Sequence, residues 1–85
     1  MDLAPHFDPE TTSVCFYTLV RGVPVRAFVT REWLVSHFGA GIPKDAGIVD
    51  AYLAHAPVID TEVSRRVARG RLEPIWLASS LAPLE

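Results

Sequence analysis

The chain has 85 residues, of which 49% are hydrophobic and 21% are charged, and its formal net charge at pH 7 is −2. This length fits one small domain, the composition is too apolar for a disordered chain, and the negative balance gives no general attraction to nucleic acid or to an anionic membrane. A single cysteine argues against a disulfide-stabilised secreted domain, and no apolar run approaches the ~20 residues that cross a bilayer.

Residues 1–12 are predicted to form a loosely held lead-in. Pro5 and Pro9 interrupt regular structure there, and Phe7 is the side chain suited to anchor the segment to a core. Residues 1–10 contain three acids and neither Lys nor Arg, which is unlike the basic start of a signal peptide. Together with the lone thiol, this predicts a protein of a reducing, cytoplasmic compartment with no membrane partner.

Two strands joined by a tight turn are predicted next. Residues 13–20 alternate between two largely apolar faces, and residues 23–29 repeat the alternation. Arg21 and Gly22 lie between them as a two-residue turn, in which glycine takes a positive φ at little cost. Pro24 cannot donate a ladder hydrogen bond, so we expect the second strand to be an edge strand.

A short helix is predicted over residues 31–38. Thr30 is a suitable N-cap, and Gly39 fits the position just after the last helical turn. Leu34 and Phe38 are one turn apart, so they share the apolar face of this helix. Gly41 and Pro43, which follow Gly39, also favour the end of the helix at this point.

A second helical region runs from an N-cap at Asp45 to Gly70. Pro57 interrupts it, and an interior proline costs about 3 kcal/mol, yet the apolar stripe keeps its helical phase on both sides. We therefore expect one long helix kinked near Pro57 rather than two separate helices. The stripe consists of Val49, Leu53, Ala56, Val63 and Val67, and it is supported by Ile48, Tyr52 and Ile59. The predicted core contains Phe16, Leu34, Phe38, Leu53, Val63 and Val67.

A third strand is predicted over residues 73–79, so the order of elements is ββααβ. A three-stranded sheet cannot bury both faces by itself, and helices packed on one face complete a two-layer domain. The predicted fold class is therefore α+β, with a mainly antiparallel sheet. Residues 13–80 form the single predicted domain and residues 81–85 a tail, whose last two residues we set aside as a vector remnant.

No group of side chains in the sequence has the spacing of a catalytic or metal site. Cys15 lies in mid-strand between apolar residues, where a thiol is usually buried and unreactive. The three histidines, among them His55, lack the close pairing of a zinc site. Glu62 precedes two arginines by three and four residues, which favours surface ion pairs over acid–base chemistry. We expect no catalytic residue, no cofactor and no metal, and hence no enzyme.

The basic residues are unevenly distributed along the chain. Half of the eight Lys and Arg residues are Arg65, Arg66, Arg69 and Arg71, at the end of the second helical region. Arginines there stabilise a helix C-terminus, and these four also form a speculative interaction patch for an acidic protein partner. Nearby acids leave little net charge, and the chain has neither Asn nor Gln to read base edges, so we expect no sequence-specific nucleic-acid binding.

Several of these features together resemble a small bacterial family. They are the Ser13–Phe16 strand start, Gly22 in the hairpin, the Thr30–Leu34 helix start leading to Phe38 and Gly39, and Tyr52, His55, Ile59 and Gly70 before an Ile75–Leu77 strand. Over residues 7–82 the chain is similar to the family catalogued as a domain of unknown function, number 1488. It departs from the family pattern at Pro57 and at Ser80–Leu81. The resemblance implies a ββααβ fold in a bacterial cytoplasm and implies no activity.

Three classes of function are open at this point, because no motif assigns one. The leading interpretation is a small non-catalytic interaction or regulatory module of a bacterial cytoplasm. The second is a weak nucleic-acid-associated protein that uses the arginines of residues 65–71. The third is a small enzyme acting through Cys15 or His55, and it ranks last because those side chains would have to converge in a cleft.

Overall fold

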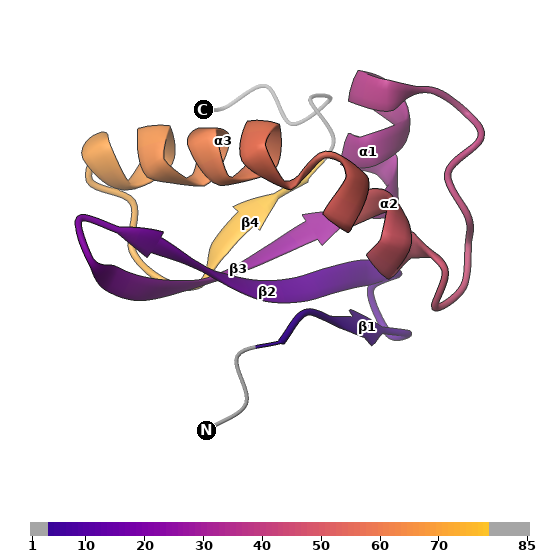
Figure 1. Ribbon diagram of the computed structural model, residues 1–85, viewed down its shortest axis with the longest axis horizontal. Helices are drawn as coiled ribbons and strands as arrows, with labels where there is room; N and C mark the ends of the chain where they lie inside the picture. Colours follow the sequence, from indigo (N-terminus) through magenta and orange to yellow (C-terminus); the bar gives the residue numbers. More distant parts are fainter. Residues whose placement is uncertain (1–3, 79–85) are drawn as a thin grey trace.

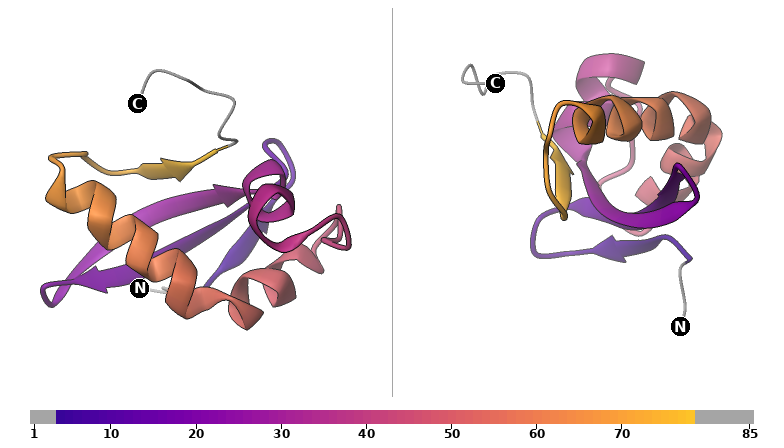
Figure 2. Two further views of the ribbon diagram at one scale, coloured as in Figure 1. Left: turned by 90° about the horizontal axis from the view of Figure 1, so that it is seen from above. Right: turned by 90° about the vertical axis from the view of Figure 1, so that its left-hand side faces the viewer.

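A curved sheet with helices on one side forms the body of the molecule (Figure 1). The structure is a computed structural model, and it describes residues 4–78. Its elements are β1 (His6–Asp8), β2 (Ser13–Val20), β3 (Val23–Thr30), α1 (Arg31–Phe38), α2 (Ile48–Ala54), α3 (Ala56–Ala68) and β4 (Ile75–Leu77). The sheet order is β1-β2-β3-β4, and the three helices lie over the same face (Figure 2). The predicted α+β class, with helices on one face of a sheet, is confirmed.

The predicted hairpin forms the centre of the sheet. β2 and β3 pair antiparallel along their whole length, from Ser13 opposite Thr30 to Val20 opposite Val23. Both turn residues have positive φ, 54° at Arg21 and 81° at Gly22. That pair of dihedrals is typical of a type I′ turn, whose twist matches the twist of the strands it joins. The turn therefore places the Arg21 side chain at the outermost point of the hairpin.

β3 is not the edge strand that Pro24 predicted. β4 pairs with it in parallel, but only along residues 27–29. Pro24 lies opposite Leu19 of β2 and outside the β4 pairing, so the missing N–H interrupts no hydrogen bond to β4. The prediction was wrong because a strand can be interior over one half and an edge over the other.

The sheet has four described strands rather than the three predicted. β1 pairs antiparallel with the start of β2, and it lies within residues 1–12, the predicted lead-in. Phe7, opposite Val14, packs partly buried against the core, as its predicted anchor role requires. Three residues are too few to produce an alternating pattern, so the sequence did not predict this strand. The end of the predicted last strand at 79 and the tail lie outside the described residues.

Helix α1 begins and ends at its predicted caps. The Thr30 hydroxyl accepts the backbone N–H of Trp33 at 3.1 Å, as an N-cap does. The same hydroxyl lies 3.3 Å from the carbonyl oxygen of Leu77, to which it donates, so the cap also ties β3 to β4. At the other end Gly39 has a φ of 107° and donates its N–H to Val35.

The second helical region is two helices, not the one kinked helix predicted. α2 ends at Ala54 and α3 begins at Ala56, with His55 at a non-helical φ of −123° between them. Pro57 lies in the first turn of α3, where its N–H would have no helical partner, so it starts a helix instead of kinking one. Asp45 is not the N-cap of α2 either, because it accepts the N–H of Gly47 in the preceding turn at 2.9 Å.

The core between sheet and helices differs from the predicted one mainly in α2, which is rotated about its axis relative to the prediction. Phe16, Leu34 and Val63 are fully buried as predicted, and Phe38 and Val67 are partly buried against them. Leu53 was wrongly placed in the core, because 54% of its surface is exposed. The inward positions of α2 and α3 are Ile48, Tyr52, Ile59 and Val63. In α2 the buried Ile48 and Tyr52 lie one residue before the predicted Val49 and Leu53, whereas in α3 Val63 was predicted correctly and Val67 is partly buried.

Candidate functional site

At one end of the molecule the tip of the β2–β3 hairpin faces the last turns of α3 (Figure 2, right). A groove lies between these two elements. Its volume is about 600 Å³. Its lining comes from both elements: Leu19, Val20, Arg21, Val23 and Val25 from the hairpin, and Ser64, Val67 and Ala68 from α3. We call it the hairpin groove. β4 runs parallel to β3, so α3 has to return the chain to the end where β3 begins, and this topology creates the groove.

Apolar side chains gather at this end without a covering layer. Leu19 and Val23, on either side of the turn, are 67% and 59% exposed. Leu72, just after α3, is 84% exposed. Together with the groove they form a patch that no described part of the chain covers. Patches of this kind on small proteins commonly mark contact surfaces.

The groove is flanked by cations. Arg21 lines it from the hairpin tip, and Arg69, which ends α3 next to the lining residue Ala68, is exposed. Neither arginine makes an ion pair within residues 4–78, where both recorded ion pairs involve Glu62. No carboxylate occurs among the described residues that line the groove. The groove is therefore an apolar channel with a positive rim.

The predicted patch Arg65, Arg66, Arg69 and Arg71 divides into different roles. Arg66 is only 18% exposed, binds Glu62 Oε2 through Nε at 3.0 Å and donates from Nη1 to the Trp76 carbonyl at 3.1 Å. It therefore ties α3 to β4 and is not available to a partner. Arg65 pairs with the other oxygen of Glu62 at 3.0 Å on the open surface. Arg69 and Arg71, which follow α3, are exposed.

Sequence reasoning missed Arg21. The sequence does indicate that Arg21 is exposed, because a type I′ turn projects its first residue outward. The position of Arg21 beside α3, however, depends on the parallel pairing of β4 with β3. Without that pairing, nothing in the sequence places the hairpin tip near the end of the helix.

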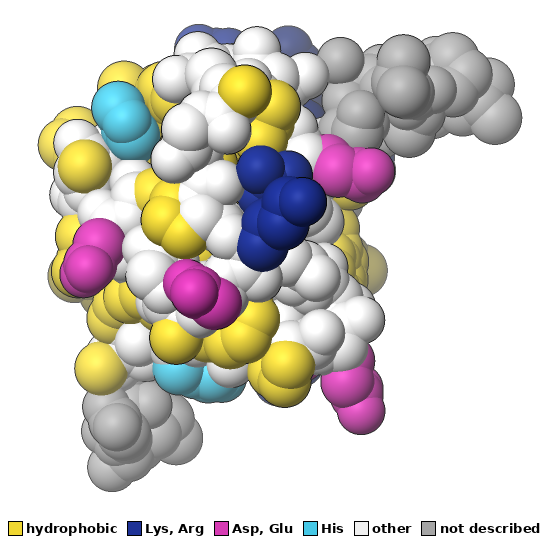
Figure 3. Space-filling model, turned by 90° about the vertical axis from the view of Figure 1, so that its right-hand side faces the viewer, with side chains coloured by type: hydrophobic (Ala, Val, Ile, Leu, Met, Phe, Trp, Pro, Cys, Tyr) yellow, Lys and Arg dark blue, Asp and Glu magenta, His cyan; other side chains and the backbone are white. Residues whose placement is uncertain are grey.

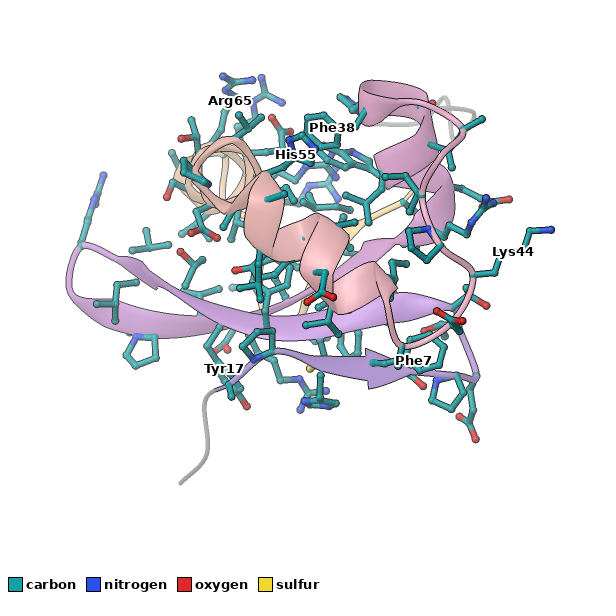
Figure 4. The ribbon with its side chains drawn as sticks, turned by 45° about the vertical axis from the view of Figure 1, so that its right-hand side comes forward. Phe7, Tyr17, Phe38, Lys44, His55 and Arg65 are labelled. Atoms are coloured by element: carbon teal, nitrogen blue, oxygen red, sulfur yellow. The ribbon has the colours of Figure 1, made fainter. Side chains whose placement is uncertain are left out.

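The structure does not bring Cys15 and His55 together. His55 stacks on Phe38 with ring centroids 3.8 Å apart on the helix side, and Figure 4 shows that pair well away from Tyr17, on the opposite side of the sheet. Cys15 is on the same side as Tyr17, in a hollow with His6 and Asp8. Burial raises the pKa of the Cys15 thiol despite the opposing effect of Arg26, so this thiol lacks the lowered pKa of a nucleophile.

The opposite end of the molecule, which carries α1 and α2, differs from the groove end. On it a few charged side chains of both signs lie apart from one another among apolar and uncharged ones (Figure 3). Among residues 4–78, no three His, Cys, Asp or Glu side chains gather as a metal site would require. None of the described helices is long and apolar enough to span a bilayer.

A model of the family described as "Protein of unknown function (DUF1488)" matches residues 1–77. The chain belongs to the DUF1488 family. The resemblance inferred from the sequence is thereby confirmed. No curated protein and no solved structure gives a match to this DUF1488 chain.

The positions that carry the DUF1488 resemblance are mainly structural. Phe16, Leu34, Tyr52, Ile59 and Leu77 are all buried between the sheet and the helices. The glycines of the pattern at the hairpin turn and after α1 have positive φ. The family pattern therefore specifies the fold, and the function of this DUF1488 domain has to be argued from its surface.

One partly buried polar cluster lies at the margin of the DUF1488 core. The Tyr52 hydroxyl donates to Asp60 Oδ1 at 3.3 Å, and the Tyr52 ring stacks on Phe16 with centroids 4.5 Å apart. Burial raises the pKa of Asp60, while hydrogen bonds from Tyr52 and Thr18 oppose that shift. The cluster joins α2, α3 and β2, and its side chains satisfy one another, which is the arrangement of a structural contact.

Proposed function

We propose that this chain is a small non-catalytic interaction module of the bacterial cytoplasm, and that it binds an acidic amphipathic segment of a protein partner in the hairpin groove. The observation that supports this proposal is an apolar groove between the hairpin and α3, with Arg21 and Arg69 at its rim. The single buried thiol is in keeping with a reducing compartment.

The apolar part of the groove favours a protein segment over a polar ligand. Its walls are valine, leucine and alanine side chains, and Leu19 and Val23 stand exposed at its mouth. An amphipathic segment buries one apolar stripe in such a groove, as helices do in other helix-in-groove complexes. Each Å² of apolar surface that is buried contributes roughly 25 cal/mol.

The charges select the sign of the partner. Arg21 and Arg69 have no acidic partner within the described residues, so a carboxylate on the segment gains a pairing without breaking one. A basic segment would place like charges together at the rim. Exposed pairs of this kind contribute about 0.2–1 kcal/mol each, so they steer and orient the partner more than they hold it.

Nucleic acid fits the same surface less well. Arg66, the centre of the predicted cluster, is bound to Glu62 and to β4 and contacts no outside group. The remaining cations flank an apolar channel, whereas a phosphate backbone is bound by a continuous basic track.

Two synthetic peptides with the same apolar stripe, one with Glu and one with Lys on the polar face, test the proposal. We expect the acidic peptide to bind and to shift the amide resonances of Val23, Val67 and Ala68, and the basic peptide to bind more weakly. Arg21→Glu should weaken the acidic peptide roughly two- to fivefold and strengthen the basic one. Lys44→Glu is the matched control, since it makes the same change in net charge on an exposed loop residue outside the groove.

Each other outcome counts against the proposal. Equal binding of both peptides, or an equal effect of Arg21→Glu and Lys44→Glu, would remove the role of the rim. A single-stranded oligonucleotide that displaces the acidic peptide and binds more tightly would favour the nucleic-acid alternative. Absence of shifts in the groove would refute the site.

A further inference from the structure

A second hollow lies on the face of the sheet that the helices leave open. It has a volume of about 320 Å³. Strand pairing sets Tyr17 beside Arg26 and Cys15 beside Phe28, and the side chains of β1 close one margin. Figure 4 shows the Tyr17 side chain pointing away from the helices on this face. The hollow is separated from the hairpin groove and shares no lining residue with it.

The aromatic rings of the open face are already stacked on one another. Phe28 and Trp76 are parallel within 7°, with centroids 4.3 Å apart. The Arg26 guanidinium carbon lies 5.4 Å from the centroid of the Phe28 ring. Phe28 is therefore held between a ring and a cation and offers little free ring surface, so this face does not suit a run of stacked bases.

Arg26 is the arginine of this hollow, and Asp8 lines the same hollow. Arg26 makes no ion pair within residues 4–78. Glu73, the acid nearest in contact, uses Oε1 to accept the backbone N–H of Arg26 at 2.7 Å. The two oxygens of Asp8 accept the Glu10 N–H at 3.1 Å and the Thr11 hydroxyl at 2.9 Å. Both carboxylates keep their charge in this region, but within the described residues neither lies within ion-pair distance of the Arg26 guanidinium, whose N–H groups can therefore bind a further carboxylate.

We propose that this hollow binds a small planar carboxylate, with its carboxylate on the Arg26 guanidinium and its apolar body against Tyr17 and Cys15. The Arg26 guanidinium lies over the Phe28 ring, and the in-plane N–H groups of an arginine match the two oxygens of a carboxylate. The volume is near the lower end of ligand pockets, roughly 300–1,000 Å³, so a single-ring compound fits and a nucleotide does not. A dianion such as phosphate is disfavoured by the charge of Asp8 in the wall.

Benzoate is the probe, followed by amide chemical shifts of the isotope-labelled protein. A ligand this small should bind with a dissociation constant on the order of 10 mM. We expect benzoate to shift the amides of Cys15, Tyr17 and Phe28. Acetate, which lacks the ring, and benzyl alcohol, which lacks the charge, should each produce much smaller shifts at equal concentration.

Arg26→Gln should weaken benzoate about tenfold, because it removes a charge-assisted pair of hydrogen bonds. Arg21→Gln, which removes a cation at the hairpin tip, should leave benzoate binding unchanged. Arg26→Lys keeps the charge and should therefore bind benzoate more tightly than Arg26→Gln does. Unchanged amide resonances away from the hollow would show that each variant is folded.

Three results would overturn the proposal. One is an absence of benzoate shifts on the open face. Another is equal binding of benzoate, acetate and inorganic phosphate, which would indicate an adventitious anion only. The third is benzoate binding that survives Arg26→Gln. None of these results bears on the hairpin groove, since the two surfaces share no residue.

Discussion

Both faces of the sheet are largely apolar, but helices cover only one of them. On the covered face Val14, Phe16, Ala27 and Val29 are fully buried against helix side chains. On the open face Cys15 and Phe28 are also buried, yet neither belongs to that core. They are covered by their own neighbours on the sheet, chiefly Trp76 and Arg26. Side chains of the covered face are buried by the helices that pack on them. Side chains of the open face are buried only by neighbouring side chains of the sheet, and polar groups such as the Arg26 guanidinium remain accessible there.

Substitution of one phenylalanine on each face tests this difference between the covered and the open face most directly. Phe16→Ala removes a fully buried ring that stacks on Tyr52, and it should lower the free energy of unfolding by about 3–5 kcal/mol. Phe28→Ala removes the ring on the open face, where Trp76 and Arg26 can move into the space, and should cost roughly 1–3 kcal/mol.

Denaturant unfolding of both variants measures the difference. A Phe28→Ala variant as unstable as Phe16→Ala would mean that the open face is a second core. A smaller loss for Phe28 leaves that face free to serve as a binding surface.

β4 belongs to both faces, because Ile75 and Leu77 point inward and Trp76 outward. Arg66 ties this strand to α3, so Arg66→Ala should cost about 1–2 kcal/mol by removing the hydrogen bonds to Glu62 and to Trp76. Arg65→Ala, which loses an exposed ion pair with the same glutamate, should cost less than about 0.5 kcal/mol. Equal thermal shifts for the two variants would contradict the different roles assigned to these neighbours.

The sequence predicted the elements whose signals are local. The Arg21–Gly22 turn needs two residues of positive φ, and the hydroxyl of Thr30 and the glycine after Phe38 fix both ends of α1. These features depend on a few adjacent residues, so propensity and spacing suffice to find them.

Features that depend on distant pairing were missed or misplaced. The parallel pairing of β4 joins residues almost fifty positions apart, and no local pattern encodes it. That pairing makes β3 an interior strand and brings Arg21 to the end of α3, so neither the groove nor the role of Arg21 was predicted, although Arg69 was part of the predicted patch. The sequence predicted a kink at Pro57, but the helix is interrupted at His55. A proline in a helical pattern is compatible either with a kink at the proline or with a new helix that begins just before it, and the pattern alone does not distinguish the two.

The same contrast between covered and open positions runs through α2. Tyr52 points into the core, and its neighbour Leu53 is more than half exposed. Leu53→Ala should therefore change the free energy of unfolding by less than about 1 kcal/mol, since little burial is lost and alanine favours helix. Ile59→Ala, on the inward side of α3, should cost about 2–5 kcal/mol as the matched comparison. If Leu53→Ala lowered the free energy of unfolding as much as Ile59→Ala, Leu53 would lie in the core as the sequence predicted, and the orientation of α2 in the structure would be wrong.

The smallest expected effect concerns the polar point of the covered face, Asp60. Its pKa is raised in the folded protein, chiefly by burial, so the folded state holds its proton more tightly than the unfolded state does. The resulting stabilisation is complete below the unfolded pKa of about 3.9 and is lost as pH rises through the folded pKa. Asp60→Asn removes the charge and keeps an oxygen to accept from Tyr52, so the variant should match the wild type in acid and be slightly more stable than the wild type near pH 7. Chemical unfolding of both proteins across this pH range gives the difference directly, because the other acids titrate alike in both. If the wild type instead becomes more stable than the variant as pH rises, the hydrogen bonds from Tyr52 and Thr18 outweigh the effect of burial on Asp60. The charged form of Asp60 would then stabilise the folded protein.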